Sequence, residues 1–227
     1  MDRLSDDTYP SSLLAASSGY KEQSIYVSHP DELIGINNKG TNLVVWVRDV
    51  KPALKKWLDQ ELWCALPGEP FRLTVQSVRQ VLADRVAQHC PTNSPGRRMF
   101  IDDLIMLTRR FAAIAGMAQM TARLVPITGP LDSRFHVDSV AQRLLTTYVG
   151  HGTEWIDGDF LGDTPPDHQS DMPAADANSL ITQLPQFSVA LFKGSRHGAA
   201  TRPLVHRSPA TPGPTGKRLL FCLDGGR

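Results

Sequence analysis

The chain has 227 residues, of which 41% are hydrophobic and 21% charged, so its length and composition suit one globular domain with a sizeable core. Lysine and arginine number 24 against 23 acidic residues, and this balance gives no support to nucleic-acid binding, which needs a basic surface. No apolar run approaches the roughly 20 residues that span a bilayer, and the acidic start lacks a signal-peptide pattern. We therefore expect a cytoplasmic protein without a membrane partner.

Cysteine usage points to the same compartment. Cys64, Cys90 and Cys222 are an odd number of thiols in a chain too long to need disulfides for its stability, so we expect them to be reduced. Cys64 and Cys90 are too far apart in the sequence for a Cys-x-x-Cys zinc site. Cys222 lies in an apolar run, which predicts an inert buried thiol.

The first half of the chain predicts mainly helices. Residues 1–24 are rich in Ser and Asp without a sustained period, which indicates a disordered or poorly ordered segment. A short β-branched and aromatic run predicts a buried strand over 42–48. Apolar residues then recur every three or four positions, which is typical of helices. These expected helices cover 52–62, 71–89 and 99–118.

The second half predicts strands. After Met120 the sequence changes to short apolar runs separated by Gly and Pro clusters, which is typical of a β-sandwich or jelly roll. Residues 157–178 form a polar insert that we expect to be either disordered or a lid over a site. The expected fold is thus α+β, with one domain over 25–227. In it, a mainly helical cover at 25–120 packs on a jelly-roll core at 121–227.

The most suggestive chemistry lies in the segment Phe135-His-Val-Asp. On a strand, His136 and Asp138 would face the same side. A histidine from another strand would complete a face of two imidazoles and one carboxylate, which suits non-haem Fe(II) oxygenases. The pair alone is not specific, because His29 and Asp31 repeat the spacing. A half-buried histidine that hydrogen-bonds its neighbouring carboxylate is the alternative interpretation.

The order of the following elements carries a resemblance. A His-x-Asp pair, a strand ending in an apolar-Phe-x-Gly turn, a distal histidine and a basic residue on the last strand resemble the Fe(II)/2-oxoglutarate-dependent dioxygenases, over residues 123–224. A closer resemblance, over about 25–225, is to the bacterial family of uncharacterised proteins called DUF1826. It rests on the segments 43–46, 135–140, 147–155, 190–194, 206–209 and 218–224.

The dioxygenase resemblance implies a fold and a ligand set. The fold would be a double-stranded β-helix, the cupin-like jelly-roll barrel. His136, Asp138 and His206 would hold the metal, and Arg218 would bind the distal carboxylate of 2-oxoglutarate, a small-molecule co-substrate. A guanidinium suits that role because its fork donates two parallel hydrogen bonds to a carboxylate.

Several alternatives stay open at this point. His197 lies nearer the Phe-x-Gly turn than His206 does and is the alternative distal ligand. His151 and Glu154 flank a Gly-Thr turn that would also approach a metal, although a solvent-facing corner is equally consistent with the sequence. Arg143 and Tyr148 are candidates for lining the co-substrate pocket.

Two functional hypotheses follow. The first is an oxygenase with Fe(II), 2-oxoglutarate and an unknown substrate. The second is a non-catalytic Zn(II)-binding protein of metal homeostasis that uses the same three residues, since imidazole and carboxylate suit both metals. The DUF1826 resemblance implies a setting beside zinc-handling GTPases of the CobW type, and so a metal-handling protein partner. Arg218 separates the hypotheses: a buried position near the metal residues favours a carboxylate co-substrate, and a solvent-facing one favours zinc.

Overall fold

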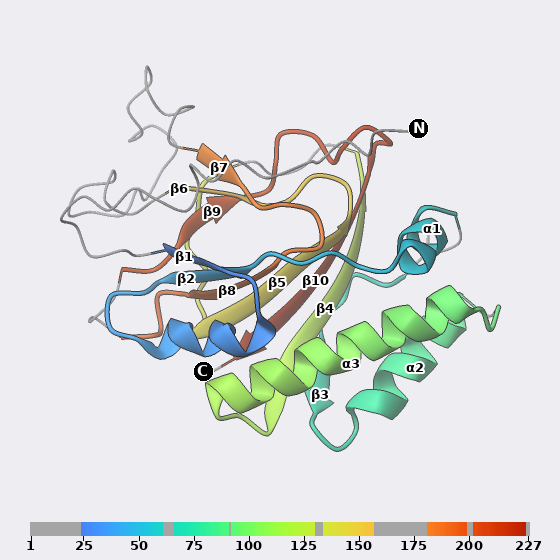
Figure 1. Cartoon of the computed structure of the whole chain (residues 1–227), viewed down its shortest axis with the longest axis horizontal. Helices are drawn as coiled ribbons and strands as arrows, with labels where there is room; N and C mark the ends of the chain where they lie inside the picture. Colours follow the sequence, from blue (N-terminus) through green and yellow to red (C-terminus); the bar gives the residue numbers. More distant parts are fainter. Residues whose placement is uncertain are drawn as a thin grey trace, which may run out of the picture.

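The computed structural model describes residues 24–60, 66–90, 92–129, 134–156, 181–198 and 202–225. These residues form a mixed α+β structure in which helices lie on one side of a large sheet and a small sheet lies on the other (Figure 1). The predicted α+β class is therefore confirmed. The insert at 157–178 and nearly all of the segment 1–24 lie outside the described residues.

The large sheet has seven strands in the order β1-β2-β8-β5-β10-β4-β3. β1 and β2 pair in parallel, and every other neighbouring pair is antiparallel. In sheet order the strands are β1 Ser24–Val27, β2 Leu43–Trp46, β8 Val189–Lys193, β5 Gln142–Val149, β10 Lys217–Gly225, β4 Gln119–Thr128 and β3 Phe71–Thr74. Three of these strands come from the N-terminal half, and one of them, β2, lies within the strand expected over 42–48.

The small sheet has three antiparallel strands in the order β7-β6-β9. They are β7 Ile181–Gln183, β6 Glu154–Ile156 and β9 Val205–Arg207. Buried residues of both sheets, among them Trp155, Leu204 and Phe192, pack into one apolar cluster. This cluster joins the small sheet to one face of the large one, and it lies beside the candidate site described below.

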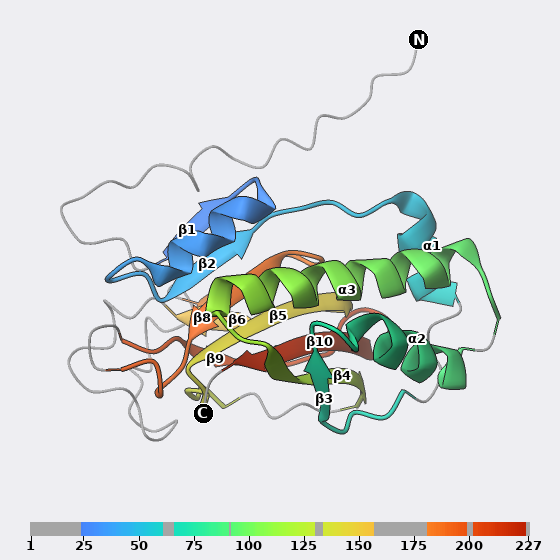
Figure 2. The same ribbon diagram turned by 90° about the horizontal axis from the view of Figure 1, so that it is seen from below.

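The opposite face of the large sheet carries the helices, with α3 lying across the strands and α2 beside it (Figure 2). The helical segments are the 3-10 helix η2 Pro30–Asn37, α1 Pro52–Gln60, α2 Val78–His89 and α3 Pro95–Ala115. Ser94 caps α3 by accepting a hydrogen bond from the Arg97 amide, and Gly116 ends it with φ 65°, a conformation that glycine adopts at little cost. None of these helices is long and apolar enough to span a membrane.

Two expectations need correction. A single helix over 71–89 is wrong, because 71–74 is the edge strand β3 and the helix begins only at Val78. Ser77 interrupts the helical pattern, since its hydroxyl accepts a hydrogen bond from the Thr74 amide and closes a turn. The expectation of three reduced thiols is wrong for Cys90, which is disulfide-bonded. An odd number of cysteines rules out complete pairing but allows one pair. Cys222 is free and buried, as expected.

Candidate metal centre

His136 and His206 face each other across an antiparallel bridge. The His136 amide donates to the His206 carbonyl at 2.9 Å, and the His206 amide donates back at 3.0 Å. Residues paired in this way present their side chains on the same side of the sheet. The two imidazole rings accordingly lie with their centroids 4.6 Å apart. Backbone pairing thus brings together two histidines that are 70 positions apart in the chain.

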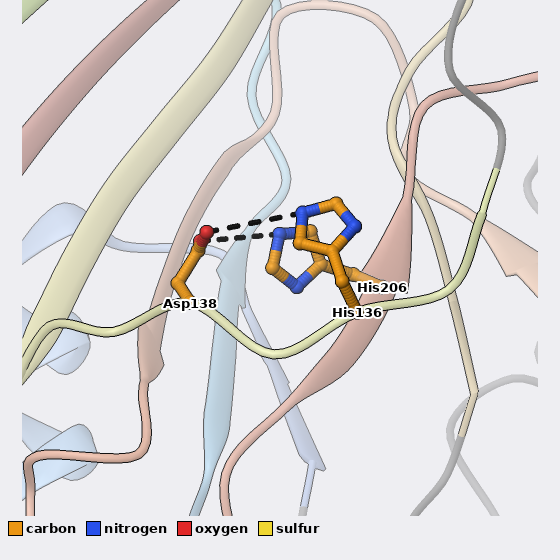
Figure 3. A group of neighbouring side chains, drawn as sticks. All are labelled: His136, Asp138 and His206. Carbon is orange, nitrogen blue, oxygen red and sulfur yellow. Dashed lines mark ion pairs between the residues drawn. The ribbon is translucent and has the colours of Figure 1, made fainter. Parts of the chain in front are cut away.

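Asp138 completes the group, with its carboxylate facing both rings (Figure 3). Its Oδ2 is 3.2 Å from Nε2 of His206, and its Oδ1 is 3.8 Å from Nε2 of His136. One candidate ligand atom from each residue lies within 4.8 Å of the others. The described residues therefore contain one cluster of two imidazoles and a carboxylate, formed by His136, Asp138 and His206.

The second nitrogen of each imidazole is held by the backbone. Nδ1 of His136 lies 3.0 Å from the carbonyl of Arg134, and Nδ1 of His206 lies 3.3 Å from the carbonyl of Leu204. A carbonyl oxygen only accepts, so these contacts assign the proton of a neutral ring to Nδ1. This assignment leaves the lone pair of Nε2 directed at the cluster, as in metal sites whose outer partners fix the histidine tautomer.

The cluster is buried on one side and open on the other. His206 is 4% exposed and packs against the Phe192 ring at a centroid distance of 4.8 Å, whereas the His136 side chain is 51% exposed. Burial opposes ionisation of Asp138, but the neighbouring His206 imidazole and the charge of Arg143 outweigh it and lower the pKa of the carboxyl. The carboxylate is therefore ionised and ready to act as a ligand at neutral pH.

These donors fit a divalent transition metal. Ligands about 2.1 Å from one ion lie about 3.0 Å apart at a right angle and about 3.4 Å apart at a tetrahedral angle. The two histidine–carboxylate distances, 3.2 and 3.8 Å, are close to that range. Small side-chain rotations would complete a three-ligand face. Two imidazoles and a carboxylate on one side of an ion suit Fe(II) with open positions, and they also suit Zn(II).

Arg143 lies behind the carboxylate. Its Nη1 donates to Oδ2 of Asp138 at 2.5 Å, and its Nε donates to Oδ1 of Asp224 at 2.6 Å. Arg123 donates to the other oxygen of Asp224 at 3.0 Å. Burial alone would lower the pKa of Arg143, but the hydrogen bond to Asp224 and the nearby carboxylates raise it, so its guanidinium stays charged. Sequence reasoning missed Asp224, although it lies six positions after Arg218 on β10 and therefore faces the same side.

Arg218 is a second buried arginine with different partners. It is 1% exposed, and its Nε and Nη2 donate to the His151 carbonyl and the Thr153 hydroxyl, both at 2.9 Å. Its Nη1 lies 3.4 Å from the hydroxyl of Ser208. No carboxylate among the described residues pairs with it, and burial lowers its pKa to about 10. Thr153 and Ser208 were not singled out from the sequence, where isolated hydroxyl residues carry no signal.

The other sequence candidates lie elsewhere. Tyr148 is on the helix-facing side of β5, where its hydroxyl donates to Asp103 at 2.5 Å. Glu154 forms an ion pair with Arg207 at 2.7 Å. The His197 amide donates to the Gly194 carbonyl at the Phe-x-Gly turn, and the His197 ring is not part of the cluster of His136, Asp138 and His206. His151 contributes its carbonyl to Arg218, while its ring contacts the Thr211 hydroxyl.

Residues 27–224 match the model of a family described as a protein of unknown function, DUF1826. The chain belongs to the DUF1826 family. The resemblance stated from the sequence motifs is thereby confirmed. The matched region contains the three residues of the candidate metal centre as well as Arg143 and Arg218. No curated protein sequence matches the chain.

Several solved structures are similar to this DUF1826 protein. The dioxygenase for auxin oxidation 1 from Arabidopsis thaliana, solved with 2-oxoglutarate, shares 12% identity over 88% of this chain and 91% of its own, with a TM-score of 0.46. The rice dioxygenase for auxin oxidation gives 13% identity over 90% and 82%, with a TM-score of 0.43. A prolyl-4-hydroxylase from Pseudomonas putida gives 12% over 80% and 98%, with a TM-score of 0.34. These similarities are too remote to assign an activity.

Proposed function

We propose that this DUF1826 protein is an Fe(II)- and 2-oxoglutarate-dependent oxygenase. The observation that carries the proposal is the convergence of His136, Asp138 and His206 beside a buried arginine that no described carboxylate neutralises. The three side chains form one face of a metal ion and leave its other positions free. The sheets that hold them are proposed to form the two sides of a double-stranded β-helix, in which the small sheet faces β8, β5 and β10.

Arg218 supports the co-substrate part of the proposal. A buried cation without a counter-ion is costly, and an incoming carboxylate would offset that cost. Ser208 follows His206 by two positions, directly after β9, and its hydroxyl contacts Arg218. This contact connects the arginine to the strand that carries a metal ligand. Arg218, Thr153 and Ser208 would together bind the distal carboxylate of 2-oxoglutarate.

Each residue then has a defined task. The imidazoles of His136 and His206 and the carboxylate of Asp138 would hold the ion, and Arg218 would orient the co-substrate. When bound, Fe(II) and 2-oxoglutarate supply the oxidising chemistry, in which one O2 oxidises the co-substrate to succinate and CO2 and adds its second oxygen atom to the substrate. Apolar side chains beside the site, including Phe192 and Leu204, exclude water from its buried side.

The test begins with metal binding by protein that carries no polyhistidine tag. The wild type is loaded anaerobically with Fe(II) and separately with Zn(II), and its metal content is compared with that of His136→Ala and His206→Ala. We expect one Fe(II) per chain in the wild type and none in either variant. 2-Oxoglutarate should tighten Fe(II) binding, and the loaded protein should slowly convert it to succinate without added substrate.

The zinc-binding alternative predicts a different result. Stoichiometric zinc that is lost in both variants and is indifferent to 2-oxoglutarate would favour a metal-binding protein without turnover. A wild type that binds neither metal would contradict both functions and leave the histidines with a structural role.

A further inference from the structure

A row of alternating charges leads from the metal cluster toward the edge of the large sheet. It runs from Asp138 through Arg143 and Asp224 to Arg123, and the last three lie on β5, β10 and β4. The side chains of the first three are only 11 to 13% exposed, whereas that of Arg123 is 36% exposed. Ion pairs with so little exposure have a defined geometry, because neither member can turn toward solvent without leaving a buried charge unpaired.

Arg143 donates to both of these carboxylates. Nη1 is bound to Asp138 and Nε to Asp224, so the guanidinium plane is fixed at two points. It therefore differs from Arg218, whose described partners are all neutral. A third carboxylate, such as one from a co-substrate, would have to compete with both existing partners. This arrangement disfavours the role of co-substrate ligand that the sequence suggested for Arg143.

We propose that Arg143, held by Asp224, is a positioning residue that makes Asp138 a metal ligand through one oxygen only. Arg143 donates to Oδ2, the oxygen that also lies 3.2 Å from Nε2 of His206. Oδ1, which faces His136 at 3.8 Å, has no arginine donor among the described contacts, and it is the oxygen that we assign to the ion. The inference rests on the proposed function, because it needs the metal face. A carboxylate that bound through both oxygens would take an additional position on the ion. If each of the three residues binds through one atom, three of the six positions of an octahedral ion stay free. A co-substrate that binds through two atoms and one O2 together need three positions.

A role of Arg143 through its charge and a role through orienting Asp138 predict opposite changes in metal affinity, so experiment can distinguish them. If Arg143 acted only through its charge, it would repel the cation, and Arg143→Gln would bind metal more tightly. Arg143→Lys would then match the wild type. If Arg143 orients the carboxylate, both variants lose the planar fork that spans Asp138 and Asp224, and both bind metal more weakly.

The experiment measures Co(II) affinity of the full chain by competition with a chelator, without 2-oxoglutarate, together with the visible absorption spectrum of the bound ion. We expect Arg143→Gln and Arg143→Lys to weaken Co(II) binding by about 10- to 100-fold, the range seen when outer partners of metal ligands are removed. Asp224→Asn, which touches no ligand, should weaken it in the same direction. The Co(II) spectrum should also change in intensity, since it depends on the coordination number.

Arg110→Gln is the matched control. It removes the same charge from an ion pair with Asp31 in the helical layer and should keep the wild-type affinity within about twofold, as expected for a distant site. Wild-type affinity in Arg143→Lys, or tighter binding by Arg143→Gln, would overturn the inference. A separate titration of the Co(II)-loaded variants with 2-oxoglutarate would overturn it too, if the variants bind Co(II) as tightly as the wild type and lose only 2-oxoglutarate. A wild type that binds no Co(II) would overturn the proposed function itself, whereas normal wild-type binding with unaffected variants overturns the positioning role alone.

Discussion

Replacement of Arg218 by methionine should weaken 2-oxoglutarate binding by at least about 100-fold, and it should change the stability of the metal-free protein by no more than about 3 kcal/mol. The wild-type guanidinium has spare N–H groups beyond those bound to His151 and Thr153. Two charge-assisted hydrogen bonds to a carboxylate contribute about 1.5–3 kcal/mol each. Their loss, about 3–6 kcal/mol, corresponds to about a 100-fold to 10,000-fold increase in Kd.

The effect of Arg218→Met on stability combines two opposing contributions. Burial lowers the pKa of Arg218 to about 10, which disfavours the charged form by roughly 3 kcal/mol. Because the folded-state pKa is lower than the unfolded-state pKa, this penalty is fully present below about pH 10 and fades as the pH rises above that value. Methionine removes the penalty but leaves the His151 carbonyl and the Thr153 hydroxyl without a donor, at about 1–3 kcal/mol each.

The net change in the free energy of unfolding is therefore within about 3 kcal/mol of zero. By comparison, loss of one partner from a buried ion pair destabilises a protein by about 3–5 kcal/mol. The assays are calorimetric titration of the metal-loaded protein with 2-oxoglutarate and denaturant unfolding of the metal-free protein at pH 7.5. Unchanged co-substrate affinity in Arg218→Met would refute the assignment. A loss of more than about 5 kcal/mol would show that Arg218 is a structural cation with a counter-ion.

Three further predictions concern other parts of the molecule. His206→Ala should lower the unfolding free energy of the metal-free protein by about 2 kcal/mol more than His136→Ala, because only His206 is buried; equal losses in denaturant titrations would contradict this. Gly194→Ala should weaken Co(II) binding at least tenfold, since its Cβ would lie 2.5 Å from the Asp138 carbonyl, and an unchanged chelator competition curve would argue against it. Tyr148→Phe should cost about 1–2 kcal/mol in urea unfolding, through loss of a buried hydrogen bond, with unaltered metal affinity; a changed metal affinity would place Tyr148 in the site.

The sequence predicted most strands of the large sheet and the three residues of the candidate metal centre. It did not predict how these three residues come together. The buried strand predicted over 42–48 contains β2, Leu43–Trp46, because its β-branched and aromatic residues form a short apolar run. The pairing of His136 with His206 depends on which distant segments become neighbours, and the pattern of one segment carries no information about that. The expectation that His136 and Asp138 point the same way is met, although only His136 is in a β-bridge.

Strand alternation would have separated Arg143 from Tyr148. Five positions, an odd number, place two residues of one strand on opposite faces, and the structure has Arg143 beside Asp138 and Tyr148 beside Asp103. The same rule would have grouped Asp224 with Arg218. The strand at 71–74 was not predicted, because the edge strand β3 carries apolar spacings that also fit the start of a helix.

The alternation along β5 also has a consequence for how this protein can change over evolution. One side of the strand carries Arg143, which we assign to the metal site. The other side carries Tyr148, which donates to Asp103 of α3, and Asp103 also accepts two hydrogen bonds from Arg48. Substitutions in the helical layer can therefore accumulate, or be introduced to raise thermal stability, without a direct effect on the metal ligands. A single strand thus separates a side on which stability can be altered from the side that carries the candidate metal-binding residues.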